Sequence, residues 1–176
     1  DLRSVMRSLE SLGGSKLVIV GDGRERANLT TFAESLAVEQ RVEFVGKVPY
    51  QEVATWIDHM DICLLPFESS DLTEAALPLK IHEYAACGRP IICSPLHEII
   101  RMYGDLLAYA TGPEQISSQV DTIQGDWKRT LRRIHRAYVR ATVVYSWDRF
   151  GSRYEKVFLR ATGRTGGKRE LGMCLW

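Results

Sequence analysis

The stretch PLKIHEYAACGRPIICS, from Pro78 to Ser94, decides the fold class. Pro78 is suited to the first turn of a helix and Gly88 to its C-terminal end, while Pro90 forbids any continuation. An apolar strand begins at Pro90, so a short helix lies between two apolar segments. Glu83 does not fit a helix that is needed only for packing. A carboxylate at that place either complements the helix dipole or holds a ligand.

Apolar strands alternate with amphipathic helices from the start of the chain to Tyr109. We expect strands at Lys16–Val20, Arg41–Gly46, Asp61–Pro66, Pro90–Cys93 and Leu106–Tyr109. We expect helices at Leu2–Leu12, Arg24–Val38, Tyr50–Met60, Pro78–Cys87 and Leu96–Met102, and a polar loop over residues 67–77. Beyond Gly112 the chain is expected to be all-helical, with helices at Asp126–Val143 and Trp147–Arg160. The alternation predicts an α/β fold with one parallel sheet and helices on both of its faces.

The composition is that of a globular domain with one core. Hydrophobic residues make up 45% of the 176 residues, charged residues 26%, and the formal net charge is +1. That balance argues against nucleic acid as a partner of the whole chain. No apolar run approaches the ~20 residues of a membrane-spanning helix, and no signal peptide is visible at Asp1. The cysteines (Cys63, Cys87, Cys93 and Cys174) fit no zinc motif. We therefore expect reduced thiols, a cytoplasmic protein, no metal and no cofactor.

Ligands of parallel sheets bind at the carboxyl ends of the strands, which here lead into residues 21–23, 46–49 and 66–78. Gly21-Asp22-Gly23 begins like the dinucleotide fingerprint, but Arg26 stands in place of the third glycine. A tight turn that lines a cleft is the favoured interpretation. Gly46 permits a ligand to approach the backbone, although a plain turn explains it equally well.

The start of the Pro78 helix has the features of an anion site. Its first free N–H groups belong to Leu79 and Lys80, and Lys80 adds a positive charge. Glu83 can accept hydrogen bonds from two adjacent hydroxyls, as on a ribose. Local chemistry leaves this interpretation and the helix-dipole interpretation open.

Other polar residues have two interpretations each. His82 is interpreted as a packing or surface residue rather than a catalytic base, since nothing nearby in the sequence would orient it. Glu68, Asp71 and Glu74 either reach the hydroxyls of a sugar or are solvated. The helix expected at Asp126–Val143 has a basic face, which consists of Lys128, Arg129, Arg132, Arg133, Arg136 and Arg140. The favoured interpretation is that water solvates this face. The alternative is that it contacts an anionic lipid or a pyrophosphate acceptor.

Taken in order, the motifs resemble a known family. They are the G-D-G turn, VEFVGKVP, DICLLP, PLKIHEYAACGRP and the terminal SWDRF. Together they are similar to the C-terminal domain of retaining GT-B glycosyltransferases of family four, from about Asp1 to Leu159. The resemblance implies a Rossmann-like domain that binds a nucleotide-diphosphate sugar. A separate N-terminal domain of the family binds the acceptor.

The resemblance also implies roles for particular residues. Glu83 matches the second glutamate of the family's E-x7-E motif, which holds the ribose hydroxyls. The backbone around Leu79 and Lys80 matches the diphosphate cradle, and Gly46 and Val48 match the segment against the base. The first glutamate of the motif falls on Ala75, so the sugar contacts are expected from backbone or from Glu74.

Two parts of the family pattern do not occur in the chain. The first strand, whose arginine and lysine neutralise the leaving diphosphate, would precede Asp1 and be central in the sheet. The acceptor domain is also missing. We therefore expect a fragment of a longer enzyme, with residues 1–160 as the donor-binding domain, residues 161–176 as a disordered tail, and no catalytic side chain.

The expected function is donor binding in the transfer of a hexose from a nucleoside diphosphate to an acceptor hydroxyl. The acceptor, a carbohydrate or a lipid-linked molecule, would be bound by the missing domain, in the cytoplasm or at the inner face of the membrane. A non-catalytic nucleotide-binding module and a fragment of a sugar-nucleotide epimerase are the alternatives.

Overall fold

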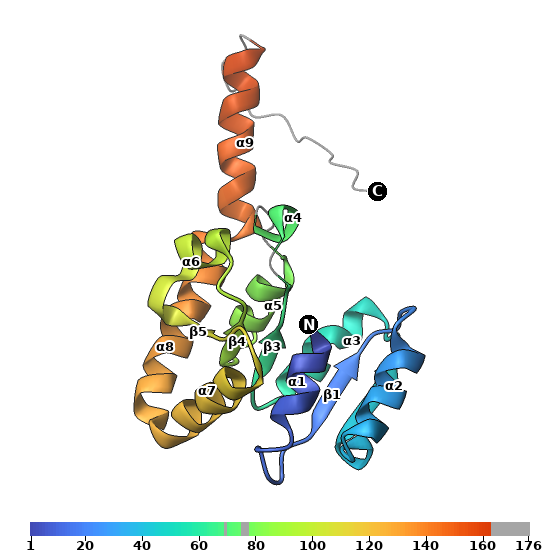
Figure 1. The fold of residues 1–176 in the computed structure, drawn as a ribbon. Helices are drawn as coiled ribbons and strands as arrows, with labels where there is room; N and C mark the ends of the chain where they lie inside the picture. Colours follow the sequence, from blue (N-terminus) through green and yellow to red (C-terminus); the bar gives the residue numbers. More distant parts are fainter. Residues whose placement is uncertain (69, 75–77, 163–176) are drawn as a thin grey trace.

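The computed structural model describes residues 1–68, 70–74 and 78–162. Ala75, where the first glutamate of the family motif would fall, and residues 163–176 of the expected tail lie outside the described residues. Figure 1 shows the arrangement of the helices and strands.

The strands are parallel, as the alternation predicts, but they form two sheets. The strands are β1 (Leu17–Val20), β2 (Val42–Gly46), β3 (Cys63–Leu65), β4 (Ile91–Cys93) and β5 (Ala108–Tyr109). One sheet pairs β1 with β2, and the other has the order β3-β4-β5. The expected α/β fold, with parallel strands and helices on both faces, is confirmed; among the described residues β1 and β3 each pair on one side only, which leaves the two sheets unpaired with each other.

The helices follow the expected order. They are α1 (Leu2–Ser8), α2 (Arg26–Ser35), α3 (Tyr50–Asp58), α4 (Asp71–Glu74), α5 (Lys80–Ala86), α6 (His97–Tyr103), α7 (Pro113–Gly125), α8 (Trp127–Val139) and α9 (Trp147–Ala161). Shorter segments are the 3₁₀ helices η1 (Glu39–Arg41) and η2 (Gly104–Leu106) and the π-helical turn η3 (Arg140–Val144).

Helix α4 corrects the prediction of a polar loop over residues 67–77. Ser70 and Thr73 form a reciprocal cap, in which Thr73 N–H donates to Ser70 Oγ (3.2 Å) and Ser70 N–H donates to Thr73 Oγ1 (2.8 Å). Such a cap satisfies the first amides of a helix. A single helical turn therefore forms where the composition indicated only a loop.

The three-stranded sheet has a core on each face, because successive side chains of a strand point to opposite sides. Ile91 and Cys93 face one core together with α5, α6 and α8. Ile92 faces the other core together with α1 and α7. Met6 of α1, with no exposed surface, packs in the same core as Leu17 of β1. Helix α1 therefore joins the two sheets, and Figure 1 shows it between β1 and β3.

Helix α9 differs from the other long helices. It extends away from the sheets and the helices that cover them (Figure 1), and none of its residues is buried. Helices α7 and α8, by contrast, each bury residues against the body of the protein.

Candidate functional site

Helix α5 fixes the backbone position of Glu83. Ile81 and Ala85, one turn apart, are buried at 0% and 1% exposure in the core. Glu83 lies between them in sequence and therefore on another face of the helix. Its side chain is half-buried and makes no hydrogen bond or ion pair with the described residues. The fold thus presents a carboxylate whose oxygens are available to hydroxyl donors.

The beginning of α5 is open to solvent. Leu79 is 66% exposed and Lys80 is exposed. The first N–H group of this turn to donate within the described chain is that of Ile81, to Pro78 O at 3.1 Å. Leu79, at the N-cap position, supplies no side-chain cap. Lys80 and Glu83 lie on the same short helix, as the sequence predicts; the binding of a diphosphate there stays a prediction.

The end of β2 has the backbone geometry that requires glycine. Gly46 has φ +86°, in the left-handed region, and its carbonyl accepts a hydrogen bond from Gly21 N–H at 2.8 Å. The turns at residues 21–23 and 46–49 therefore lie side by side. Val48 is half-buried in the second of them.

Arg26 occupies the third position of the glycine motif and lies across this pair of turns. Its guanidinium donates to Phe44 O (3.3 Å) and stands over the Phe44 ring, 5.7 Å from the centroid. A Cβ atom on Gly46 would stand 3.7 Å from Arg26 Nη1. The geometry is that of a tight turn stabilised by a side chain, which is the interpretation favoured from the sequence.

A cleft of about 400 Å³ lies at the carboxyl ends of β3, β4 and β5. Its lining consists of Asp1, Phe67, Glu68, Glu74, Ser94, Pro95, Leu96 and Thr111. Glu74 is the only one of the six predicted site residues in this lining; the others lie on α5 and in the β2–α3 connection.

Two hydroxyl residues of the cleft were missed by the sequence reasoning. Ser94 Oγ accepts from Phe67 N–H (2.8 Å) and donates to Phe67 O (2.7 Å), which ties the ends of β3 and β4 together. Thr111 follows β5 at the same edge. The signal that locates them is their place directly after adjacent strands. Glu74 Oε2 accepts from His97 N–H at 3.0 Å, so its carboxylate is held at the start of α6.

His82 is a packing residue, but the expectation that nothing orients it is wrong. His82 Nδ1 lies 2.7 Å from Tyr103 Oη, and the ring contacts that of Tyr145 at a centroid distance of 5.5 Å. Burial lowers the pKa of His82 below its ordinary value. Tyr103 is fully buried, so this trio links α5 to α6 and to the segment that precedes α9.

The basic face of α8 is solvated only in part. Arg133 donates to Leu107 O and Arg140 to Met102 O, while Arg136 Nη1 lies 3.7 Å from an oxygen of Asp105. Arg133 thus links α8, and Arg140 links η3, to backbone carbonyls at residues 107 and 102, while the exposed Arg136 pair adds a weaker contact. Lys128, Arg129, Arg132 and Arg136 are exposed, so the interpretation of a solvated face holds for these four residues, and Arg133 and Arg140 are partly buried.

The thiols are suited to packing. Cys63 and Cys93 are buried, and burial raises the pKa of each to about 12, which keeps them protonated at neutral pH. Over residues 1–68, 70–74 and 78–162, no group of three metal-binding side chains occurs. No helix in that part of the chain is both long and apolar enough to cross a bilayer.

The fold occurs in several solved proteins. Sucrose-phosphate synthase from Thermosynechococcus elongatus matches 92% of the chain with 16% identity and a TM-score of 0.78. The C-terminal domain of the group 1 glycosyl transferase LpcC from Francisella tularensis matches 83% of the chain with 14% identity and a TM-score of 0.68. HepE of Anabaena, solved in complex with UDP-glucose, matches 86% with 17% identity and a TM-score of 0.69.

The chain covers different fractions of the lengths of the proteins that it matches. It spans 80% of the LpcC domain, but 42% of the sucrose-phosphate synthase and 44% of HepE. The chain spans 22% and 36% of the length of the curated relatives that it matches.

The family is shown by the sequence match. The family of group 1 glycosyl transferases matches residues 2–126, which is more than half of the chain. The chain therefore belongs to the group 1 glycosyl transferases, and its fold is that of the C-terminal domain of a GT-B enzyme.

Proposed function

We propose that this chain is the donor-binding half of a retaining glycosyltransferase, which transfers a hexose from a nucleoside diphosphate to an acceptor hydroxyl. The observation that carries the proposal is the carboxylate of Glu83. Ile81 and Ala85 hold its helix in the core, and the carboxylate has no hydrogen bond or ion pair within the described chain. A carboxylate in that condition is suited to the paired hydroxyls of a ribose.

The neighbouring groups suit the rest of a nucleotide. Lys80 and the exposed backbone at Leu79 provide positive charge and N–H donors for a diphosphate, one turn before Glu83. Gly46 and Val48 provide a surface without a bulky side chain at the end of β2, where we propose that the base lies. HepE was solved with UDP and with UDP-glucose, which supports a uridine nucleotide as the first ligand to test.

The polar cleft suits the sugar. Glu68, Glu74, Ser94 and Thr111 bring carboxylate and hydroxyl oxygens to one edge of the three-stranded sheet. We propose Glu74, whose orientation is fixed by His97 N–H, as the residue that contacts the sugar hydroxyls. The chemistry needs no nucleophile from this chain, because positioning of the donor and stabilisation of the diphosphate charge accelerate such transfers.

Calorimetric titration of the chain with UDP and UDP-glucose tests the donor site. Hydrogen bonds to a charged group contribute roughly 1.5–3 kcal/mol, so Glu83→Ala should weaken UDP binding by about ten- to a hundredfold. The helix should persist, since alanine favours helix. Unchanged affinity in a folded Glu83→Ala protein would refute the ribose contact.

Glu114→Ala is the matched control, because Glu114 is an exposed glutamate in the first turn of α7. If Glu83 only complements a helix dipole, both variants should lose about 0.3–1 kcal/mol of stability and neither should lose affinity.

A sugar-nucleotide epimerase would release free UDP without an acceptor, and a purely nucleotide-binding module would transfer no sugar in any longer form of the protein. The anomeric configuration of the product, observed by NMR in a longer active form, tests the retaining course.

A further inference from the structure

Arg26, the first residue of α2, contacts both turns at the ends of β1 and β2. Its Nη2 donates to Phe44 O at 3.3 Å, and its guanidinium stands over the Phe44 ring, 5.7 Å from the centroid. Its Nη1 lies 3.9 Å from Asp22 Oδ1 in the first turn. A Cβ atom on Gly46 would stand 3.7 Å from the same Nη1, so the guanidinium packs on the side where Gly46 has no side chain. One side chain therefore links the first turn to the end of β2.

The turn after β2 has little other support from hydrogen bonds. The carbonyl of Gly46 accepts from Gly21 N–H at 2.8 Å. The register of the two strands shifts just before this point, so the regular ladder ends there. The backbone groups of Lys47 and Val48 make no hydrogen bond with the described residues. The position of the turn therefore depends largely on the Gly21 bond and on the contacts of Arg26.

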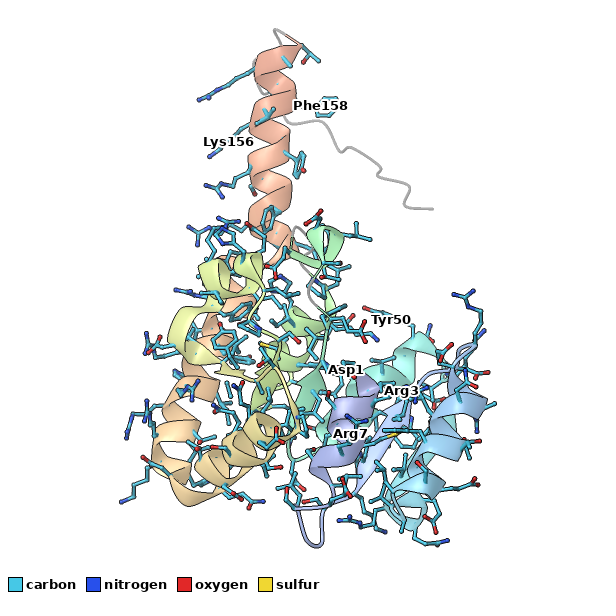
Figure 2. All side chains as sticks on the ribbon, viewed as in Figure 1. Asp1, Arg3, Arg7, Tyr50, Lys156 and Phe158 are labelled. Atoms are coloured by element: carbon cyan, nitrogen blue, oxygen red, sulfur yellow. The ribbon has the colours of Figure 1, made fainter. Side chains whose placement is uncertain are left out.

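The arginines of α1 make a simpler contact. Arg3 and Arg7 stand over the ring of Phe32 in α2, at 4.8 and 5.5 Å from its centroid. Figure 2 shows both side chains on α1. Neither makes a hydrogen bond or an ion pair with the described residues. These two arginines therefore contact only a ring of the neighbouring helix, whereas Arg26 also binds the backbone at the end of a strand.

We propose that Arg26 is a positioning residue of the donor site, which holds residues 46–48 in the place where they contact the nucleobase. This inference rests on the proposed donor site. Binding groups must be held within about 0.5 Å of their productive geometry, and the residues that support them fix that geometry. Arg26 acts through the backbone of the turn rather than through a contact with the nucleotide. Its loss should therefore affect recognition of the base more than recognition of the diphosphate.

Calorimetric titration with UDP and with inorganic pyrophosphate tests this role. Arg26→Ala should weaken UDP binding by about fivefold or more, because the hydrogen bond to Phe44 O no longer fixes the turn. Pyrophosphate has no base and should bind the variant and the unchanged chain equally. Unchanged UDP affinity in a folded Arg26→Ala protein would overturn the proposal. An equal loss of pyrophosphate affinity would overturn it too, because Arg26 would then act on the phosphates through its charge.

Two control variants separate the position of the turn from charge and from general packing. Arg24 lies in the same connection, is exposed and makes no hydrogen bond or ion pair with the described residues. Arg24→Ala therefore removes the same charge without changing a contact of the turn after β2. Arg7→Ala removes an arginine that stands over a ring elsewhere. Both controls should bind UDP like the unchanged chain, and a loss in either as large as that of Arg26→Ala would overturn the proposal.

Hydrogen exchange of the Gly21 amide tests the turn without any ligand. This amide donates to Gly46 O, so its protection reports whether the two turns stay together. NMR should show exchange about fivefold faster or more in Arg26→Ala, and unchanged exchange in Arg24→Ala. Equal exchange in Arg26→Ala and the unchanged chain would overturn the positioning role and leave the donor site in place. If the unchanged chain binds no UDP, the donor site itself fails, and the positioning role fails with it.

Discussion

Helices α8 and α9 follow each other in the chain and share one sequence pattern, yet only the first buries residues in the body of the protein. Both are amphipathic, and both carry several arginines. Helix α8 buries Thr130 and Ala137. Arg133 of α8 donates to Leu107 O near β5, and Arg140 of η3 donates to Met102 O in α6, whereas α9 buries no residue. The comparison shows that a basic amphipathic pattern does not by itself determine a partner. Small buried residues and free carbonyls on the facing surface determine it.

The largest expected difference between the two helices concerns a buried position. Ala137 is 2% exposed in the core shared with Ala85 of α5. Ala137→Asp places an unpaired charge in that core and should lower the free energy of unfolding by about 3–5 kcal/mol. Val157→Asp makes a similar change on the exposed face of α9 and should alter it by less than about 0.5 kcal/mol. Urea denaturation measures the free energy of unfolding of both variants. A similar decrease in the two variants would show that α9 packs on the body.

A smaller difference is expected for the arginines. Arg133→Met keeps much of the side-chain packing but removes the hydrogen bond to Leu107 O, which should cost about 1–2 kcal/mol. Arg153→Met on α9 removes a cation without a recorded partner in the described chain and should have almost no effect on stability. Thermal melts of the two variants at one salt concentration check the difference. Equal midpoints would contradict an anchoring role for Arg133.

His82 lies close to the boundary between the two helices, since its ring contacts Tyr145, directly before the start of α9. Burial lowers the pKa of His82, so the folded state binds the proton more weakly than the unfolded chain. Its contribution to stability is therefore complete above the ordinary histidine pKa and declines as the pH falls through that value towards the lowered one. His82→Gln should show a shallower decline in the free energy of unfolding between pH 7 and 5, at roughly the range where histidine titrates. A decline as steep as that of the unchanged chain would refute the role of His82.

The order of the elements could be predicted from the sequence, because it depends on local patterns. Alternating apolar strands and amphipathic helices identify a parallel α/β fold, and Gly88 and Pro90 mark the end of α5. The division into two sheets, with no pairing between β1 and β3 in the described chain, agrees with the expectation from the family resemblance that a central strand does not occur in the chain. The cap between Ser70 and Thr73 was visible as a spacing, but the polar composition of the loop obscured it.

For the candidate site, the sequence indicates which elements carry the residues, while their binding roles stay predictions. Glu83 and Lys80 lie on α5 as the sequence indicates, and Glu74 lines a cleft together with Ser94 and Thr111. Strand ends that are distant in sequence form that cleft, so only the sheet order reveals it. The orientation of His82 by Tyr103 also depends on a contact across 21 residues.

The smallest effect is expected for the ion pair between Arg136 and Asp105. The nitrogen and oxygen stand 3.7 Å apart, and the side chains are 62% and 80% exposed. Water and salt screen such pairs, which contribute between zero and about 1 kcal/mol. Asp105→Asn should therefore shift the stability by less than about 0.5 kcal/mol, and 0.5 M salt should remove even that difference. If Asp105→Asn lowers the free energy of unfolding as much as Arg133→Met does, the exposed ion pair rather than the carbonyl contact holds α8 on the body. The difference between α8 and α9 would then rest on charge alone.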